Sequence, residues 1–263
     1  MTEVIRGTAP TMLLIHGAWQ GAWAFDAWRP LLAAAGWASV AIDLPGNGHG
    51  PLAGAPAGLD HYTACAAAAA AAIDGPLVVV GHSGGGLTAT QLAEALPDRV
   101  AAVVHLAGMM LPSGCGYAAF AARIRPQPHG IVAHLQWNDD RSASRVPPEA
   151  ALTVFLHDCE PAAARAAAAR LTWQPEAGRA VAPCWTAQRA GRVPRVYVEC
   201  TQDRSLPVAV QQAMQAATPG ARRVVLDCGH VPQLAQPVQL TRLLGAELAL
   251  LGLAPSVSPR GND

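Results

Sequence analysis

The sequence contains no lysine, so all 18 of its basic residues are arginine. They are balanced by 18 acidic residues, and the formal net charge at pH 7 is zero. No long block of like charges is present. A nucleic-acid-binding surface requires a cluster of surplus arginine and lysine, so we expect no nucleic-acid partner.

Cysteine is scarce, and its spacing does not suggest a metal site. The 263-residue chain has 6 cysteines, with no Cys-x-x-Cys pair and no His/Cys cluster at zinc spacing. Hydrophobic residues make up 51% of the chain, which is enough to build a core without disulfides. We therefore expect buried free thiols, and no metal or organic cofactor.

Long apolar runs are also missing. Residues 1–6 lack the basic start and apolar stretch of a signal peptide. No uninterrupted apolar stretch reaches the roughly 18 residues that a membrane-spanning helix needs. These absences lead us to expect a soluble, cytoplasmic protein that makes no membrane contact.

Short β-branched runs alternate with Ala/Leu-rich helical stretches along much of the chain. This alternation predicts an α/β fold in which helices cover a mostly parallel sheet. The expected strands are 12–16, 38–43, 77–81, 100–106, 196–200 and 222–227, and the expected helices are 23–35, 60–72, 84–95, 208–216 and 237–251.

The alternation stops between residues 111 and 194. This stretch is rich in proline and histidine and contains one clear helical run at 161–171. An interruption of this length between two core strands predicts an inserted cap, because long structureless loops are uncommon in compact domains. We expect a core formed by residues 1–110 and 195–254, a cap at 111–194, and a flexible tail at 255–263.

The strongest local motif is Gly81-His82-Ser83-Gly84-Gly85, which lies between an apolar strand and a helical stretch. This is the context of a nucleophile elbow, where a tight strand-to-helix turn exposes a serine hydroxyl above the sheet. The turn crowds its neighbours, so glycine is needed two residues on either side of the serine. A phosphate-binding loop is the alternative, but no Gly-Lys-Ser/Thr and no Gly-x-Gly-x-x-Gly spacing is present.

A serine hydroxyl needs a base to remove its proton, and the base needs an acid behind it. In sheets that carry a nucleophile elbow, these residues occur along the chain in the order Ser, acid, His, and each comes after a strand. Asp203 and His230 occupy such positions. Asp227 is a minor alternative for the acid, and Asp43 fits a loop-fixing role better.

Four other histidines need a separate interpretation. His129, His134 and His157 belong to the predicted cap, where surface or hydrogen-bonded structural roles are favoured. His105 lies inside an apolar strand and is interpreted as a core histidine with satisfied hydrogen bonds.

The tetrahedral intermediate of acyl transfer carries an oxyanion that needs two N–H donors. Gly84, the residue after the nucleophile, supplies the first candidate. Ala18, in the loop after the first strand, supplies the second. Gly17 permits a backbone bend that turns the Ala18 N–H inward.

These motifs together resemble the plant methylesterase and hydroxynitrile lyase family of α/β-hydrolases and its bacterial relatives. The resemblance implies a core sheet, a small cap over the active site and a compact homodimer. It rests on LIHGAWQGAW at 14–23, GHSGGG at 81–86, FLHDC at 155–159, ECTQD at 199–203 and GHVP at 229–232.

Two positions distinguish the chemistries within this family. Lyase members resemble one another in carrying lysine directly after the catalytic histidine and threonine after the histidine of the first strand. Here those positions hold Val231 and Gly17, and the chain has no lysine to substitute from elsewhere. The resemblance therefore favours a carboxylic ester hydrolase without a cofactor.

We expect a small apolar or aromatic ester as substrate, with a methyl ester favoured. Lyase, lactonase, thioesterase or cyclisation chemistry by the same residues stays open, as does a ligand-binding receptor of the same fold. Trp173 and Trp185 are apolar enough to line the pocket, although packing between cap and core explains any single tryptophan equally well. The expected substrate-binding residues are His16, Gly17, Met109, Met110, Trp137 and Val231.

Overall fold

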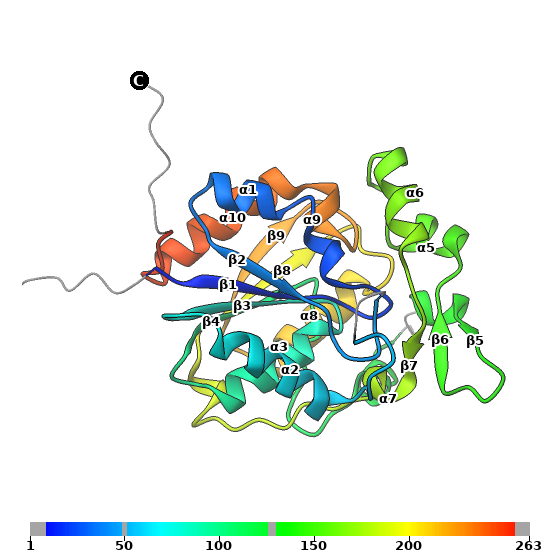
Figure 1. Cartoon of the computed structure of the whole chain (residues 1–263), viewed down its shortest axis with the longest axis horizontal. Helices are drawn as coiled ribbons and strands as arrows, with labels where there is room; N and C mark the ends of the chain where they lie inside the picture. The colour runs from blue at the N-terminus through cyan, green and yellow to red at the C-terminus, as the bar shows by residue number, and fades with distance from the viewer. Residues whose placement is uncertain (1–8, 49–51, 126–129, 256–263) are drawn as a thin grey trace, which may run out of the picture.

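The structure is a computed structural model and describes residues 9–48, 52–125 and 130–255 (Figure 1). Its centre is a sheet of six parallel strands in the order β2-β1-β3-β4-β8-β9. All six strands expected from the sequence are present, with ends shifted by at most one residue. They are β1 (Thr11–Ile15), β2 (Ser39–Ile42), β3 (Leu77–His82), β4 (Val100–Leu106), β8 (Arg195–Cys200) and β9 (Ala221–Leu226).

Each face of the sheet is buried by its own layer of helices, because successive strand residues point to opposite faces. Leu14 of β1 packs with α1 (Arg29–Ala34) and α10 (Pro237–Leu250). Leu13 packs on the other face with α2 (Leu59–Ala71) and α3 (Gly85–Ala95). Figure 1 shows these two layers above and below the sheet, with α8 (Val208–Ala217) in the lower one. In the ranges described, no helix is both long and apolar enough to cross a bilayer.

The single helix expected at 23–35 is wrong, because the chain forms two short helices there. A 3-10 helix, η1 (Ala22–Phe25), is followed by a turn, and α1 then begins at Arg29. Pro30 explains the break. Proline lacks an N–H and its ring clashes with the carbonyl four residues earlier, so it is tolerated only in the first turn of a helix. In this chain Pro30 occupies that first turn.

The segment between β4 and β8 contains short helices and a small three-stranded antiparallel sheet, β5-β6-β7. Figure 1 shows α5, α6 and this small sheet together at one side of the molecule, outside the two helical layers. The elements are α4 (Tyr117–Ala121), η2 (Ile131–His134), β5 (Gln136–Trp137), β6 (Ala143–Arg145), α5 (Pro148–Val154), α6 (Pro161–Ala169), β7 (Gln174–Pro175), α7 (Glu176–Arg179) and η3 (Ala190–Arg192).

This segment is attached to the loops that leave the carboxyl ends of the core strands. The Trp19 N–H, just after β1, donates to Gln174 Oε1 (3.3 Å), and the Thr172 N–H donates to Trp19 O (3.0 Å). The Gly229 N–H, just after β9, donates to Asp158 Oδ2 (2.6 Å). Ligands of open α/β sheets collect at these strand ends, so the segment lies beside the expected site. A short α9 (Pro232–Ala235) follows the loop after β9.

All six cysteines are free thiols, but only half of them are buried as expected. Cys159, Cys200 and Cys228 lie in the interior, whereas Cys184 is exposed. Cys65 and Cys115 are partly buried.

We predict that Leu244→Ala in α10 lowers the free energy of unfolding by about 2–5 kcal/mol, because the truncation leaves a cavity in a close-packed core. Leu244 is 1% exposed and packs against the sheet. Leu250→Ala in the same helix is the control, since Leu250 is 68% exposed. Urea denaturation of both variants checks the prediction. Equal losses of stability would contradict the packing of the Leu244 face of α10 against the sheet.

Candidate active site

Ser83 lies at a strained turn between β3 and α3. Its φ of 51° is in the left-handed region, which a residue with a side chain adopts at a cost of about 1–3 kcal/mol. Three backbone hydrogen bonds fix the turn. The Ser83 N–H donates to Leu106 O (3.2 Å), and Ser83 O accepts from the N–H groups of Gly86 (3.1 Å) and Met109 (2.8 Å).

The glycines on either side of Ser83 are required by close backbone approach, as the sequence predicts. A Cβ at Gly81 would lie 2.5 Å from Gly85 O. A Cβ at Gly85 would lie 2.5 Å from both His16 O and Ile15 O. Neither clash can be relieved by a side-chain movement, because the opposing atoms belong to the backbone.

The structure brings Ser83, His230 and Asp203 into one hydrogen-bonded chain. His230 Nε2 lies 3.0 Å from Ser83 Oγ, and His230 Nδ1 lies 2.7 Å from Asp203 Oδ2. The carboxylate can only accept, so Nδ1 carries the proton and Nε2 presents its lone pair to the serine hydroxyl. The residues follow β3, β8 and β9, whose carboxyl ends share one edge of the sheet.

Asp203 is held by donors from its own loop and from α8. Its Oδ1 accepts from the backbone N–H groups of Ser205 and Leu206, both at 2.8 Å. Its Oδ2 also lies 3.4 Å from Gln211 Nε2, which provides a weak further contact. Asp203 is buried. A buried carboxylate needs such partners, and they fix the oxygen that faces His230.

The two alternative acids do not contact His230. Asp227 is exposed and accepts from Thr201 Oγ1 (2.5 Å) and Gln202 Nε2 (2.9 Å), and these bonds lower the pKa of its carboxyl. Asp43 accepts from the Ala22 N–H (2.7 Å) and so fixes the loop after β1. The structure therefore leaves Asp203 as the acid nearest to the histidine.

The expectation that His105 has satisfied hydrogen bonds is wrong. The ring is buried beside Gly86, and neither of its nitrogens has a partner among the residues described. It stacks on Tyr197, with 6.3 Å between the ring centroids. Burial lowers the pKa of His105 to about 3, so the ring is neutral.

His134 and His157 are not members of the hydrogen-bonded chain that Ser83, His230 and Asp203 form. His134 is exposed, and His157 is partly buried, with no partner for its Nδ1 among the described residues. His129 lies outside the described residues.

Sequence reasoning missed two rings that hold His230 in place. His82 Nε2–H donates to His230 O (2.8 Å), while the Gln20 amide lies against the other ring nitrogen, 3.0 Å from Nδ1. Burial lowers the pKa of His82 to about 3, so this ring is neutral. Phe155 stacks on His230 with 5.3 Å between the ring centroids. His82 belongs to the elbow motif and Phe155 to the FLHDC segment at 155–159, so both stood in motifs already singled out, although no role was assigned to either residue.

Ala18 and Gly84, whose backbone N–H groups are the expected oxyanion donors, both line the cavity that contains Ser83. Neither donates to a protein acceptor within residues 9–48, 52–125 and 130–255. The register of β1 against β3 pairs Ile15 with Gly81, and this pairing brings the following loop beside the elbow. A Cβ on Gly84 would lie 3.8 Å from Ala18 N, so the two donors are close together.

Gly17 is needed for a different reason from the bend that the sequence suggested. Its φ is not in the left-handed region; the positive φ in this loop belongs to Trp19, at 63°. A Cβ on Gly17 would lie 2.8 Å from Ser83 Cβ, so glycine here leaves room for the serine. His16 fixes the same loop. Its Nδ1–H donates to Gly17 O (2.8 Å), and its Nε2 accepts from the Leu44 N–H (3.0 Å).

A cavity of about 480 Å³ opens at Ser83. His16, Gly17 and Met109 line it, as the sequence predicts. Part of the cavity wall is polar. There Tyr62 Oη accepts from Asn47 Nδ2 (2.8 Å) and from Gln174 Nε2 (3.0 Å). The remaining wall is mostly apolar and includes Trp19, Leu44, Leu87, Ile131, Val132, Val181 and Leu206.

Met110 and Trp137 do not line this cavity. Met110 is buried in the cluster between β8 and α8, because adjacent residues of an extended chain point to opposite sides. Trp137 lies on β5, where the guanidinium groups of Arg141 and Arg179 approach its ring at 4.9 and 5.6 Å. Both sequence expectations are wrong on this point.

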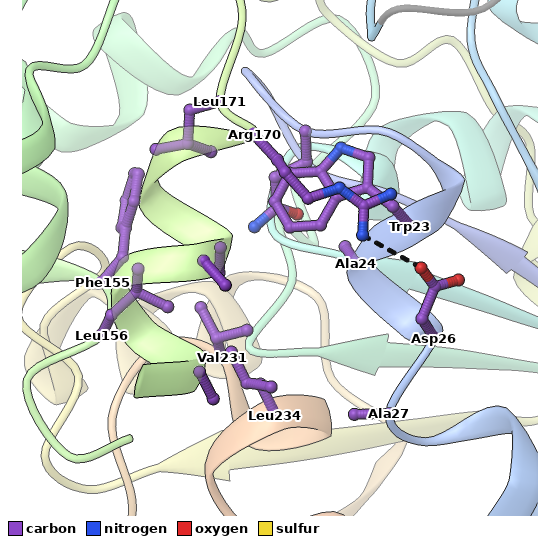
Figure 2. A pocket seen from close by; sticks show the side chains of 14 residues that line it. Trp23, Ala24, Asp26, Ala27, Phe155, Leu156, Arg170, Leu171, Val231 and Leu234 are labelled. Atoms are coloured by element: carbon purple, nitrogen blue, oxygen red, sulfur yellow. Dashed lines mark hydrogen bonds and ion pairs between the residues drawn. The ribbon is translucent and has the colours of Figure 1, made fainter. Parts of the chain in front are cut away.

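Val231 lies on a second pocket, of about 190 Å³, whose wall does not include Ser83 (Figure 2). Figure 2 shows Val231 and Leu234 opposite Phe155, with the Arg170 guanidinium lying over the Trp23 ring. The side chain of Val231 joins the apolar cluster of α5 and α6, so its expected contact with substrate is wrong.

Comparisons with known proteins agree on one family. Residues 12–243 match the family described as "Alpha/beta hydrolase family". A pyrethroid hydrolase of Sphingobium wenxiniae is 30% identical over 248 residues, covering 90% of this chain and 87% of that protein. The polyneuridine aldehyde esterase of Rauvolfia serpentina is 27% identical, with 88% and 93% covered. A solved structure of a pyrethroid hydrolase has a TM-score of 0.80 at 29% identity, with 92% and 98% covered.

We predict that Gly85→Ala destabilises the fold by about 1–3 kcal/mol or more, because its methyl group would be forced against backbone carbonyls of β1. Gly54→Ala is the control, since a Cβ there meets nothing within 4 Å. Thermal denaturation followed by circular dichroism compares the two variants. Equal melting temperatures for the two variants would contradict the steric account of the elbow.

Proposed function

We propose that this chain, which belongs to the alpha/beta hydrolase family and is a carboxylic ester hydrolase, cleaves its substrate through an acyl-enzyme on Ser83. The membership confirms the resemblance drawn from the sequence motifs. One observation carries the proposal. The hydrogen-bonded chain Asp203–His230–Ser83 ends at a cavity that is also lined by Ala18 and Gly84, whose N–H groups have no acceptor among the described residues.

Acylation starts with proton transfer from Ser83 Oγ to His230 Nε2, 3.0 Å away. The serine oxygen then attacks the ester carbonyl carbon. Asp203 stabilises the imidazolium that forms and keeps the ring in the required orientation. The carbonyl π electrons move to oxygen, which becomes the oxyanion of a tetrahedral intermediate.

The N–H groups of Gly84 and Ala18 are the proposed donors to that oxyanion. They are fixed before substrate arrives, so no reorganisation is needed as charge develops, and each such donor contributes about 10²–10³-fold in rate. Collapse of the intermediate expels the alcohol, which takes its proton from His230. Water then attacks the acyl-enzyme, with His230 as base, and releases the carboxylic acid and free Ser83.

The cavity favours an apolar or aromatic ester. Its volume of about 480 Å³ accommodates a medium-sized organic molecule, and most of its wall is aliphatic. We propose an ester with a small alcohol group, a methyl ester being the simplest case. The relatives by name include a pyrethroid hydrolase and an aldehyde esterase, and these names support ester hydrolysis here without specifying this chain's substrate.

We predict that Ser83→Ala lowers kcat/KM for p-nitrophenyl and methyl esters by about 10³-fold or more, because the nucleophile is lost while the oxyanion donors remain. Circular dichroism checks that the variant is folded. A fluorophosphonate should label the wild-type peptide that contains Ser83 and leave the variant unlabelled. Ester turnover by the variant at the wild-type rate would refute the proposed mechanism.

We further predict that Asp203→Asn lowers kcat by about 10⁴-fold, because an amide cannot stabilise the imidazolium and favours the wrong tautomer. Asp227→Asn is the matched control, since Asp227 is exposed and its carboxylate accepts from Thr201 and Gln202. Steady-state kinetics should show nearly wild-type rates for the control. A larger loss in Asp227→Asn than in Asp203→Asn would reverse the assignment of the acid.

A further inference from the structure

The wall of the Ser83 cavity carries one ion pair, formed by Glu176 and Arg179 of α7. They are the two acidic or arginine side chains among the residues that line the cavity. Arg179 Nε lies 2.7 Å from Glu176 Oε2, and Arg179 Nη2 lies 2.8 Å from Glu176 Oε1. The two side chains are 21% and 29% exposed, so the pair is neither fully buried nor freely solvated.

This pairing leaves part of the guanidinium unused. The bidentate contact occupies Nε and Nη2, and Nη1 has no acceptor in the part of the chain that the structure describes. Its two N–H groups are not enclosed by protein. The Trp137 ring lies against the guanidinium, 5.6 Å from its carbon, so both the carboxylate and an aromatic face hold its orientation.

Tyr117, at the start of α4, supplies a second polar atom on the same cavity. Its hydroxyl forms no hydrogen bond with any described residue and is not enclosed by protein. Burial and the charge of Asp203 raise the pKa of Tyr117, against the opposing effect of Arg179, to about 12. The phenol is therefore protonated at neutral pH and can donate.

We propose that Arg179 Nη1 and the Tyr117 hydroxyl form a polar subsite that binds a neutral oxygen acceptor of the substrate, remote from the ester that is cleaved. The inference rests on the proposed function, because it concerns the acyl group that Ser83 attacks. It names a substrate class, namely esters that carry a second carbonyl oxygen.

Charge favours a neutral acceptor over a carboxylate at this subsite. Glu176 already compensates the charge of Arg179. A carboxylate of the substrate would therefore be repelled by Glu176 while it is attracted by Arg179. A ketone or amide oxygen accepts the same hydrogen bonds without this repulsion. An apolar substrate would leave the donors unpaired in a largely apolar cavity, which weakens its binding relative to the carbonyl compound.

The test compares methyl oxoalkanoates that differ in the position of the ketone with the methyl alkanoates of equal chain length. Varying the ketone position is necessary because the spacing between Ser83 and the subsite decides which isomer reaches both. For the preferred isomer we expect Arg179→Met to lower kcat/KM by about 10–100-fold, the range for a hydrogen bond to a charged group. Its effect on the plain alkanoate should stay within about twofold.

Two further variants make the result specific. Arg141→Met is the matched control, because Arg141 also lies over Trp137, at 4.9 Å, but does not line the cavity. It should leave both substrates unaffected. Tyr117→Phe changes only the hydroxyl, so it tests the subsite even if Arg179→Met does not fold, and it should weaken only the keto ester, by several-fold.

The possible failures are distinguishable from one another. If Arg179→Met and Tyr117→Phe lowered kcat/KM equally for keto and plain esters, both residues would serve only in packing. That result would overturn the proposed subsite. A preference for the monomethyl ester of a dicarboxylic acid would show an anion site and overturn the neutral acceptor. Failure of the proposed function would appear earlier, as plain-ester turnover that is unaffected by Ser83→Ala.

Discussion

The backbone turn at Ser83 is the constraint on which the rest of the site depends. A non-glycine residue at positive φ is unfavourable, and here the neighbouring strands hold it by hydrogen bonds to Leu106 and Met109. The same turn leaves no room for a Cβ at two positions, because Gly81 faces the backbone of Gly85 and Gly85 faces the backbone at the end of β1. The sheet thus holds Ser83 in this conformation at its edge, close to Ala18 and Gly84, whose N–H groups have no acceptor in the part of the chain that the structure describes.

The elbow also positions His230, so Ser83 and His230 are linked more directly than their order in the chain suggests. His82 belongs to the elbow and donates to the backbone carbonyl of His230, 2.8 Å away. Phe155, from the segment between β4 and β8, stacks on the imidazole ring of His230. With Asp203 at Nδ1, the ring is held by groups from three separate parts of the chain. Phe155 also lines the second pocket, together with Val231. The wall of that pocket does not include Ser83.

The segment between β4 and β8 supplies much of the cavity wall. Its small sheet presents Trp137, and α7 presents Glu176 and Arg179, so a charged donor is held against an aromatic face on a mostly apolar wall. Tyr62, Asn47 and Gln174 add a second polar region, whose hydrogen bonds to one another are already formed. Ser83, Asp203 and His230 thus follow strands of the central sheet, whereas the Glu176–Arg179 pair comes from the segment between β4 and β8.

The sequence by itself determined the strand order along the chain, the elbow and the positions of Asp203 and His230. Strand periodicity, glycine spacing and chain order are local properties, and parallel strands place their carboxyl ends at one edge. Only the tertiary structure decided which side chains meet the cavity. Met110, Trp137 and Val231 were misplaced because a side chain's direction depends on the packing of its element, which no local pattern specifies. The position of the Glu176–Arg179 pair on the cavity could not be predicted for the same reason, because residues distant in sequence form the cavity wall together.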